Sequence, residues 1–115
     1  MRKLITFAVL AVLASAATAD PVVDAYDKAL AAGKVALADQ KRCEEQIQKG
    51  KQEACKESSK SYQLYRARAK QFTTSVEPHD LLNHVTPQQM DQITLITNQI
   101  GASMDYVSAY LDSKK

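Results

Sequence analysis

The sequence predicts an all-α fold, an elongated three-helix bundle made of a helical hairpin and a long third helix. Apolar residues recur at alternating steps of three and four along most of the chain, which is typical of helices that pack side by side. The two cysteines of the chain, Cys43 and Cys55, flank Gly50 at a point where this periodicity stops. We therefore expect the chain to turn back at Gly50.

Cys43 and Cys55 are predicted to form a disulfide near the tip of that hairpin. In one unbroken helix their Cα atoms would lie roughly 18 Å apart, at about 1.5 Å per residue, whereas a disulfide needs a separation below about 7 Å. Gly50 allows a break because glycine adopts the left-handed conformation at little cost. The alternative is a pair of reduced, buried cysteines that pack as small apolar residues.

Residues 1–19 have the three-part pattern of a secretory signal peptide. Basic residues at positions 2 and 3 precede an apolar run over 4–14, and small residues lead to Ala19, after which we expect cleavage. The run is shorter than the roughly 20 residues of a membrane span, although an uncleaved anchor is the alternative. We expect a periplasmic or secreted protein with no stable membrane insertion after cleavage, in an oxidising compartment that favours the disulfide.

The mature chain, residues 20–115, is predicted to form a single helical domain. Loss of Arg2 and Lys3 lowers the number of Lys and Arg residues from 15 to 13, against 13 Asp and Glu. A formally neutral protein argues against nucleic-acid binding, which usually requires a basic excess. Basic residues gather over 49–70 between two acidic parts of the chain. We interpret this as charge matching between neighbouring helices, with a basic docking face as the alternative.

The first helix is expected over about 22–48. Asp20 is a preferred N-cap residue and Pro21 suits the first helical position. Gly33 would cost about 1 kcal/mol relative to alanine in a helix, so we expect another helix to approach closely there, with a slight bend of the helix as the alternative. The residues that follow helical spacing and are expected to face inward are Val23, Tyr26, Leu30, Gly33 and Leu37, beside a stripe of mostly small residues, with Cys43 and Ile47 nearer the tip.

The second helix is expected over about 52–76, and its apolar spacing is the most regular in the chain. We interpret Tyr62 and Tyr65 as core residues whose hydroxyl groups reach water, with ligand stacking as the alternative. The residues that form its predicted seam are Cys55, Ser58, Tyr62, Tyr65, Ala69, Phe72 and Val76.

The segment after this helix is expected to interrupt the bundle, because the residue before Pro78 disfavours the helical conformation. A short helical turn is expected there, with Leu81 and Leu82 facing inward. His79 and His84 also lie here, but they are five residues apart rather than the three or four of helical metal ligands, and no thiol is free. We expect no metal site and interpret both histidines as solvated, with a pH-sensing role as the alternative.

The third helix is expected over about 87–112. Thr86, Pro87 and Gln89 form the pattern of a capping box with proline at the first helical position. Gly101 lies beside the apolar stripe and is expected to permit a second close crossing. The stripe itself consists of Met90, Ile93, Thr97, Ile100, Met104, Val107 and Leu111.

A second row of residues widens the apolar face of the third helix: Leu95, Ala102, Tyr106 and Tyr110. We interpret this row as wrapping around the two other helices, because a helix that packs between two neighbours needs a broad apolar face. The alternative is an exposed strip for a protein partner, since tyrosine is frequent among the residues that dominate binding energies. The row is therefore the candidate partner surface.

The sequence carries no pattern of an enzyme active site or a cofactor site. It lacks a Gly-x-Ser-x-Gly motif and a Cys-x-x-Cys motif, and three scattered glycines do not form a phosphate-binding loop. We expect a non-enzymatic protein without cofactor or metal. The predicted function is binding to another protein of the cell envelope, as an accessory of a secretion or conjugation system or as a toxin-immunity component.

Two alternatives remain, a periplasmic chaperone or stress-binding protein and a membrane-active killing factor. Residues 85–89, Val-Thr-Pro-Gln-Gln, resemble the LTxxQ motif of a family of bacterial helical stress chaperones, with valine in place of leucine and in a single copy. This resemblance implies the chaperone alternative. The neutral mature chain lacks the basic amphipathic face typical of membrane-active helices.

Overall fold

The computed structural model describes residues 20–115, so the predicted signal peptide over 1–19 lies outside the described residues. The described chain consists of helix α2 (Pro21–Ile47), helix α3 (Glu53–Thr74), a short 3-10 helix η1 (Pro78–Asn83) and helix α4 (Pro87–Ser113). The prediction of an all-α helical bundle is confirmed. The ends of the three long helices lie within two residues of those expected from the sequence.

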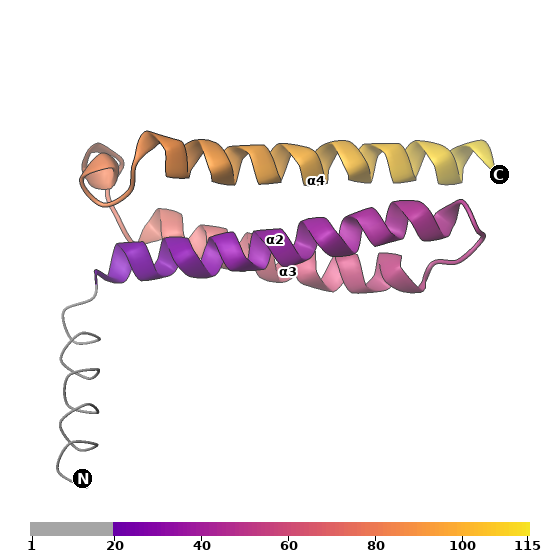
Figure 1. Ribbon diagram of the computed structural model, residues 1–115, viewed down its shortest axis with the longest axis horizontal. Coiled ribbons are helices and arrows are strands. Elements are labelled where there is room, and N and C mark those ends of the chain that lie inside the picture. Colours follow the sequence, from indigo (N-terminus) through magenta and orange to yellow (C-terminus); the bar gives the residue numbers. More distant parts are fainter. Residues whose placement is uncertain (1–19) are drawn as a thin grey trace, which may run out of the picture.

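The three long helices lie side by side (Figure 1). Helices α2 and α3 form an antiparallel hairpin, η1 lies at the end opposite the hairpin tip, and α4 runs in the same direction as α2. The C-terminal end of α4 therefore lies beside the tip. The near-parallel arrangement follows from the steps of three and four in the sequence, which keep each apolar stripe facing its neighbours.

The hairpin turns at Gly50, as predicted. Gly50 has a φ of 74°, and it is the only residue of the described chain with a positive φ. Its N–H donates to the carbonyl of Ile47 over 3.0 Å, and Lys51 donates to the carbonyl of Gln46 over 2.9 Å. Gln46 also accepts a hydrogen bond from the N–H of Ala54 through its side chain, at 3.1 Å. The end of α2 thus supplies the cap at the start of α3, where Gln52 makes no side-chain cap.

The predicted disulfide between Cys43 and Cys55 is present. The Cα atoms of the two residues lie 4.5 Å apart, and no cysteine remains free. Cys43 and Ile47 are buried at this end of the bundle, together with Val107 of α4. In the chain-entropy model, closing a loop of this length stabilises the fold by about 3 kcal/mol.

Helix α2 is the central helix, and its buried face differs from the predicted one. Val23, Leu30 and Leu37 are only partly buried. The buried line lies along the neighbouring stripe instead, because small residues there let α3 and α4 approach closest. The residues on this line, at alternating steps of four and three, are Val22, Tyr26, Ala29, Gly33, Ala36, Gln40, Cys43 and Ile47.

Gly33 marks a close crossing, as predicted. A methyl group on its Cα atom would lie 2.8 Å from Cε1 of Tyr65 in α3 and 3.1 Å from Cγ2 of Ile96 in α4. The same expectation for Gly101 is wrong, because a methyl group there would meet nothing within 4 Å. One glycine therefore lies between helices and the other faces open space.

Helix α3 buries the predicted seam. Ser58, Tyr65 and Phe72, seven residues apart, are its most buried members, and the four others are partly buried. The hydroxyl of Tyr65 lies 2.7 Å from Oγ1 of Thr97 in α4, which joins the two helices. The interpretation of Tyr65 as a core residue is correct, and its hydroxyl bonds to another helix of the bundle.

A second buried cluster closes the end of the bundle near η1. The ring of Tyr26 meets Phe72 edge to face, with centroids 5.6 Å apart, and its hydroxyl donates to the carbonyl of Gln89 over 2.8 Å. Leu81 packs against this cluster, but Leu82 is 65 % exposed, so the prediction that both face inward is wrong. In a 3-10 helix neighbouring side chains point about 120° apart, which separates the two leucines.

Helix α4 begins with the predicted capping box between Thr86 and Gln89. Its buried residues are Ile96, Ile100, Ser103 and Val107. Thr97 and Met104, both predicted to face inward, are exposed. The buried face is rotated and narrower than expected, because α4 packs chiefly on α2.

Candidate partner surface and polar sites

The predicted partner row on α4 lies at the surface. Leu95 is 56 % exposed and Tyr106 is 44 % exposed. Ala102 is exposed as well, whereas Tyr110 is partly buried beside the hairpin tip. The favoured interpretation, in which this row wraps around the other helices, is therefore wrong for its first three members. Their steps of seven and four place them on one side of α4.

A groove of about 480 Å³ between α2 and α4 borders this side of α4. Tyr106 stands at the groove, where its hydroxyl accepts a hydrogen bond from Nε2 of Gln48 over 3.0 Å. Tyr110 follows one turn later, with its ring centroid 6.3 Å from that of Tyr106. The residues that line the groove are Leu37, Lys41, Glu44, Gln48, Gln99, Ala102, Ser103 and Tyr106.

The groove between α2 and α4 combines apolar side chains with one charge of each sign. Lys41 and Glu44 both come from α2, and two amides also line the groove, those of Gln48 at the end of α2 and of Gln99 in α4. The hydroxyl of Ser103 is buried at the groove without a hydrogen-bond partner in the described chain. Surfaces that bind proteins are about as apolar overall as the rest of a protein surface, so the exposed aromatic residue Tyr106 is more informative than this mixture.

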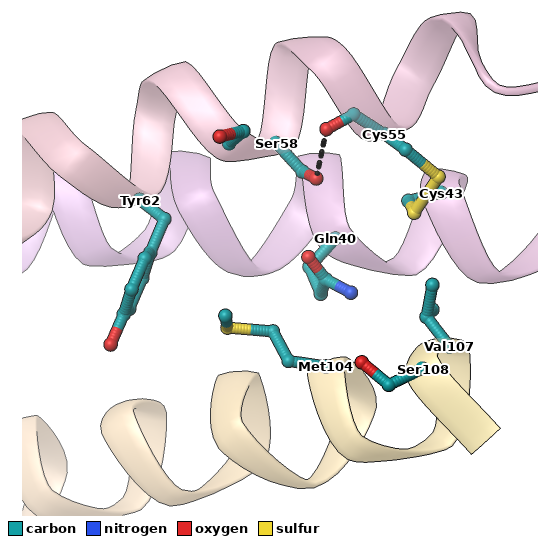
Figure 2. Close-up of a pocket in the computed structure, with 9 residues that line it drawn as sticks. Gln40, Cys43, Cys55, Ser58, Tyr62, Met104, Val107 and Ser108 are labelled. Carbon is teal, nitrogen blue, oxygen red and sulfur yellow. Dashed lines mark hydrogen bonds between the residues drawn. A yellow bond between two sulfur atoms is a disulfide. The ribbon is translucent and has the colours of Figure 1, made fainter. Parts of the chain in front are cut away.

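A second groove, of about 200 Å³, lies beneath the disulfide and is bordered by all three long helices (Figure 2). Sequence analysis missed one of its two buried polar residues, Gln40, the other being Ser58. The available signal was its position on the line of residues from Val22 to Ile47, where every other member is apolar or glycine. The residues that line this groove are Gln40, Cys43, Cys55, Ser58, Ser59, Tyr62, Met104, Val107 and Ser108.

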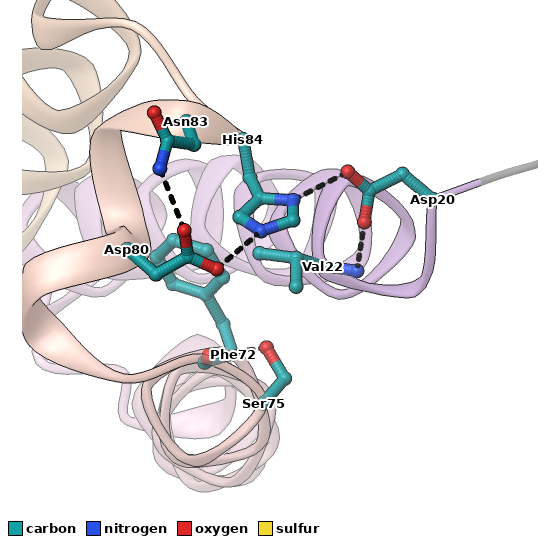
Figure 3. Close-up of polar contacts among 7 residues, drawn as sticks. All are labelled: Asp20, Val22, Phe72, Ser75, Asp80, Asn83 and His84. Atoms are coloured by element: carbon teal, nitrogen blue, oxygen red, sulfur yellow. Dashed lines mark hydrogen bonds and ion pairs between the residues drawn. The ribbon is translucent and has the colours of Figure 1, made fainter.

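A cluster of polar residues joins the start of α2 to η1 (Figure 3). Nδ1 of His84 lies 2.6 Å from Oδ2 of Asp20, and Nε2 lies 2.9 Å from Oδ2 of Asp80. Asn83 donates to the other oxygen of Asp80 over 2.6 Å. The interpretation of His84 as a solvated loop histidine is wrong, since its ring lies between two carboxylates.

These contacts shift the protonation equilibria of all three groups. Hydrogen bonds to Asp20 and Asp80 raise the pKa of His84 above its ordinary value. The hydrogen bond from His84 lowers the pKa of Asp20, and hydrogen bonds from Asn83 and then His84 lower the pKa of Asp80. The cluster therefore favours a charged imidazolium between two ionised carboxylates.

Within residues 20–115, no group of three or more His, Cys, Asp or Glu side chains is arranged to hold a metal ion. None of the helices in this part of the chain is both long enough and apolar enough to cross a membrane. Comparison of the sequence with protein-family models and curated proteins, and of the fold with solved structures, found no match. The site geometry is therefore the basis for any functional proposal.

Proposed function

We propose that this chain is a small, exported, non-enzymatic helical protein that binds another protein of the cell envelope. The binding site is the α4 surface, which we define as Leu95, Ala102 and Tyr106, together with the adjoining groove between α2 and α4. The observation that carries the proposal is the exposure of Leu95 and Tyr106, at 56 % and 44 %, on the side of α4 that borders this groove.

The rest of the fold supports such a role by holding this surface in place. Gln48, the residue that follows α2, donates a hydrogen bond to the hydroxyl of Tyr106, so part of the ordering cost of that side chain is already met before a partner binds. The disulfide fixes the hairpin end of α2, on which α4 packs. Tyrosine combines a large apolar ring with a polar end and is enriched among residues that dominate binding energies.

Export is supported by the signal-peptide pattern over residues 1–19 and by the joined cysteines, which persist in oxidising compartments. Within the envelope, the partners that this role fits best are components of secretion or conjugation systems and toxins that an immunity protein neutralises. Both need a compact binder that presents a preformed surface.

The test is capture of the partner in the native host. A photo-crosslinking residue at position 102 should yield one dominant crosslinked protein, and Leu95→Ala/Tyr106→Ala should lower its capture at least tenfold, since truncating central interface residues costs about 2 kcal/mol or more. Leu82→Ala is the control, because Leu82 is also a large exposed apolar residue, at 65 %, but lies in η1. Unchanged capture by the double variant, with an unchanged Tm, would exclude this surface.

A second candidate, a periplasmic chaperone, is favoured by a different groove. Val35 of α2 and Leu64 of α3 are 55 % and 51 % exposed and line a largely apolar groove of about 280 Å³, with Lys28 and Arg68 among its lining residues. A chaperone would use such a groove to hold unfolded clients. Suppression of the aggregation of an unrelated reduced protein, lost in Val35→Ser/Leu64→Ser, would favour this candidate over a dedicated binder.

A further inference from the structure

Gln40 lies deep in the groove beneath the disulfide, with only 5 % of its surface exposed. In Figure 2 its carboxamide extends from α2 into the space between Ser58 of α3 and Met104 of α4. The hydrogen bonds of the described chain include none that joins this carboxamide to another residue, and its oxygen and nitrogen are open to solvent, since Ser103 Oγ is the one buried side-chain polar atom of residues 20–115 without a partner. An amide that is open to a groove bonds to water while the groove is empty, and a ligand with a matching donor and acceptor can take the place of that water. The groove therefore contains a donor and an acceptor that are free to bind a ligand.

The walls around this amide suit an aromatic ring. The Cys43–Cys55 disulfide and the thioether of Met104 place sulfur atoms at the groove, and Tyr62 contributes a ring at its side. Sulfur makes favourable contacts with aromatic groups at about 5 Å. The groove volume of about 200 Å³ is close to that of a cavity of roughly 150 Å³ that binds benzene. One substituted ring is therefore the size that fits.

The groove also selects against charge. None of its lining residues is a carboxylate, a lysine, an arginine or a histidine. A charged ligand would lose hydration there without gaining a counter-charge, which is costly. A hydroxyl group, in contrast, both donates and accepts, and so matches the oxygen and the nitrogen of one carboxamide.

We propose that the groove beneath the disulfide binds a neutral phenol, with its ring beside Met104 and the disulfide and its hydroxyl on the carboxamide of Gln40. The phenol is either a free small molecule or the side chain of a tyrosine in a peptide. This site is separate from the α4 surface and from the groove beside it, because the two grooves share no lining residue. The proposal therefore stands or falls independently of the proposed function.

The test is a titration of the oxidised, ¹⁵N-labelled protein followed by NMR. p-Cresol should cause saturable shifts of the side-chain amide of Gln40 and of the backbone amides of Ser59 and Ser108. Toluene, which lacks the hydroxyl, should bind roughly 2- to 10-fold more weakly, the effect of one neutral hydrogen bond. N-acetyl-tyrosinamide distinguishes the sources: tighter binding than p-cresol indicates a peptide tyrosine, and weaker binding indicates a free phenol.

Gln40→Leu tests the role of the carboxamide alone, because it removes this group and keeps a side chain of similar size. Affinity for p-cresol should fall to that for toluene, while Tm should not fall, because leucine fills similar space and the carboxamide makes no hydrogen bond to protein that would be lost. Gln92→Leu, an exposed change on α4 outside the groove, is the control and should alter neither affinity. Met104→Ala, at a residue 36 % exposed, should weaken both ligands and gives a second test if Gln40→Leu does not fold. Equal affinities of the unmodified protein for p-cresol and toluene, or shifts confined to residues outside the groove, would overturn the proposal.

Discussion

Nδ1 of His84 lies 2.6 Å from a carboxylate oxygen of Asp20, although the two residues are 64 positions apart in the sequence. Asp20 is also the N-cap of α2, where it accepts a hydrogen bond from the N–H of Val22 over 2.8 Å. His84 ends η1, and its other ring nitrogen bonds to Asp80. One imidazole therefore joins the first residue of the described chain to the segment that leads into α4.

The pairing around His84 predicts how stability depends on pH. The pKa of His84 is raised above 6.5. The stability that its protonated ring contributes is therefore complete below pH 6.5 and is lost as the pH rises through the raised pKa. The pKa values of Asp20 and Asp80 are lowered below 3.8, so their contribution is present above pH 3.8 and is lost as the pH falls through the lowered values. The cluster should stabilise the fold most between these limits.

Thermal unfolding across this range tests the pairing. From about pH 5 to about pH 9, the Tm of the unmodified protein should fall as His84 loses its proton. His84→Gln should remove this fall, and His79→Gln, a change at an exposed neighbouring histidine, should retain it. If Tm depends on pH in the same way for the unmodified protein and for His84→Gln, the contact between His84 and Asp20 adds nothing to stability.

The apolar spacing of the sequence was enough to predict the bundle and the seam of α3, and the two cysteines on either side of Gly50 were enough to predict the turn. It did not determine how α2 and α4 are rotated about their axes. Each of these helices has two adjacent apolar stripes, and the one that faces inward depends on how closely its neighbours approach. In α2 the small side chains Ala29 and Ala36 occupy the line of closest approach, whereas Leu30 and Leu37 cover its edges.

The two helical glycines should respond to alanine in opposite ways. Gly101→Ala should raise the free energy of unfolding by about 0.5–1 kcal/mol, because alanine favours the helix and the site is open. Gly33→Ala should lower it by about 1 kcal/mol or more, because the added methyl group meets the buried ring of Tyr65, which the bond to Thr97 holds in place. Urea unfolding of both variants measures the difference. Equal effects would show that the crossing at Gly33 is not tight.

The hydroxyl of Tyr26 should stabilise the junction between α2 and α4. Tyr26→Phe leaves the edge-to-face contact with Phe72 in place but removes the hydrogen bond to the carbonyl of Gln89. The free energy of unfolding should fall by about 1 kcal/mol, the usual value for one such bond. Tyr62→Phe, at a half-buried tyrosine of α3, is the control and should change stability less. A larger loss of stability in Tyr62→Phe than in Tyr26→Phe would show that the bond from Tyr26 to Gln89 does not stabilise this junction.

The polar sites were harder to predict than the helices. The position of Gln40 on the buried line follows from counting back three residues from Cys43, so the sequence contained a signal for it. The contact between His84 and Asp20 has no local signal, because it depends on how η1 returns toward the start of α2. The exposure of Leu95 and Tyr106 likewise depends on α4 having one main neighbour rather than two.

The disulfide should contribute more to stability than any other single bond in the fold. Both cysteines of the chain are in this bridge, so a reducing agent acts on one bond only. Reduction should lower the free energy of unfolding by about 3 kcal/mol. For a domain of this size, that corresponds to a Tm lower by roughly 12–24 °C. Calorimetry with and without reductant measures the shift.

Cys43→Ala/Cys55→Ala separates loss of the bridge from side effects of the reductant. The double variant should unfold near the Tm of the reduced protein, and reductant should not lower that Tm further. Its helix content should remain unchanged below Tm, because the hydrogen bonds of Gly50 and Gln46 at the turn do not involve sulfur. If reductant leaves the unmodified protein at the same Tm, the turn itself holds the hairpin closed and the bridge is not what stabilises it.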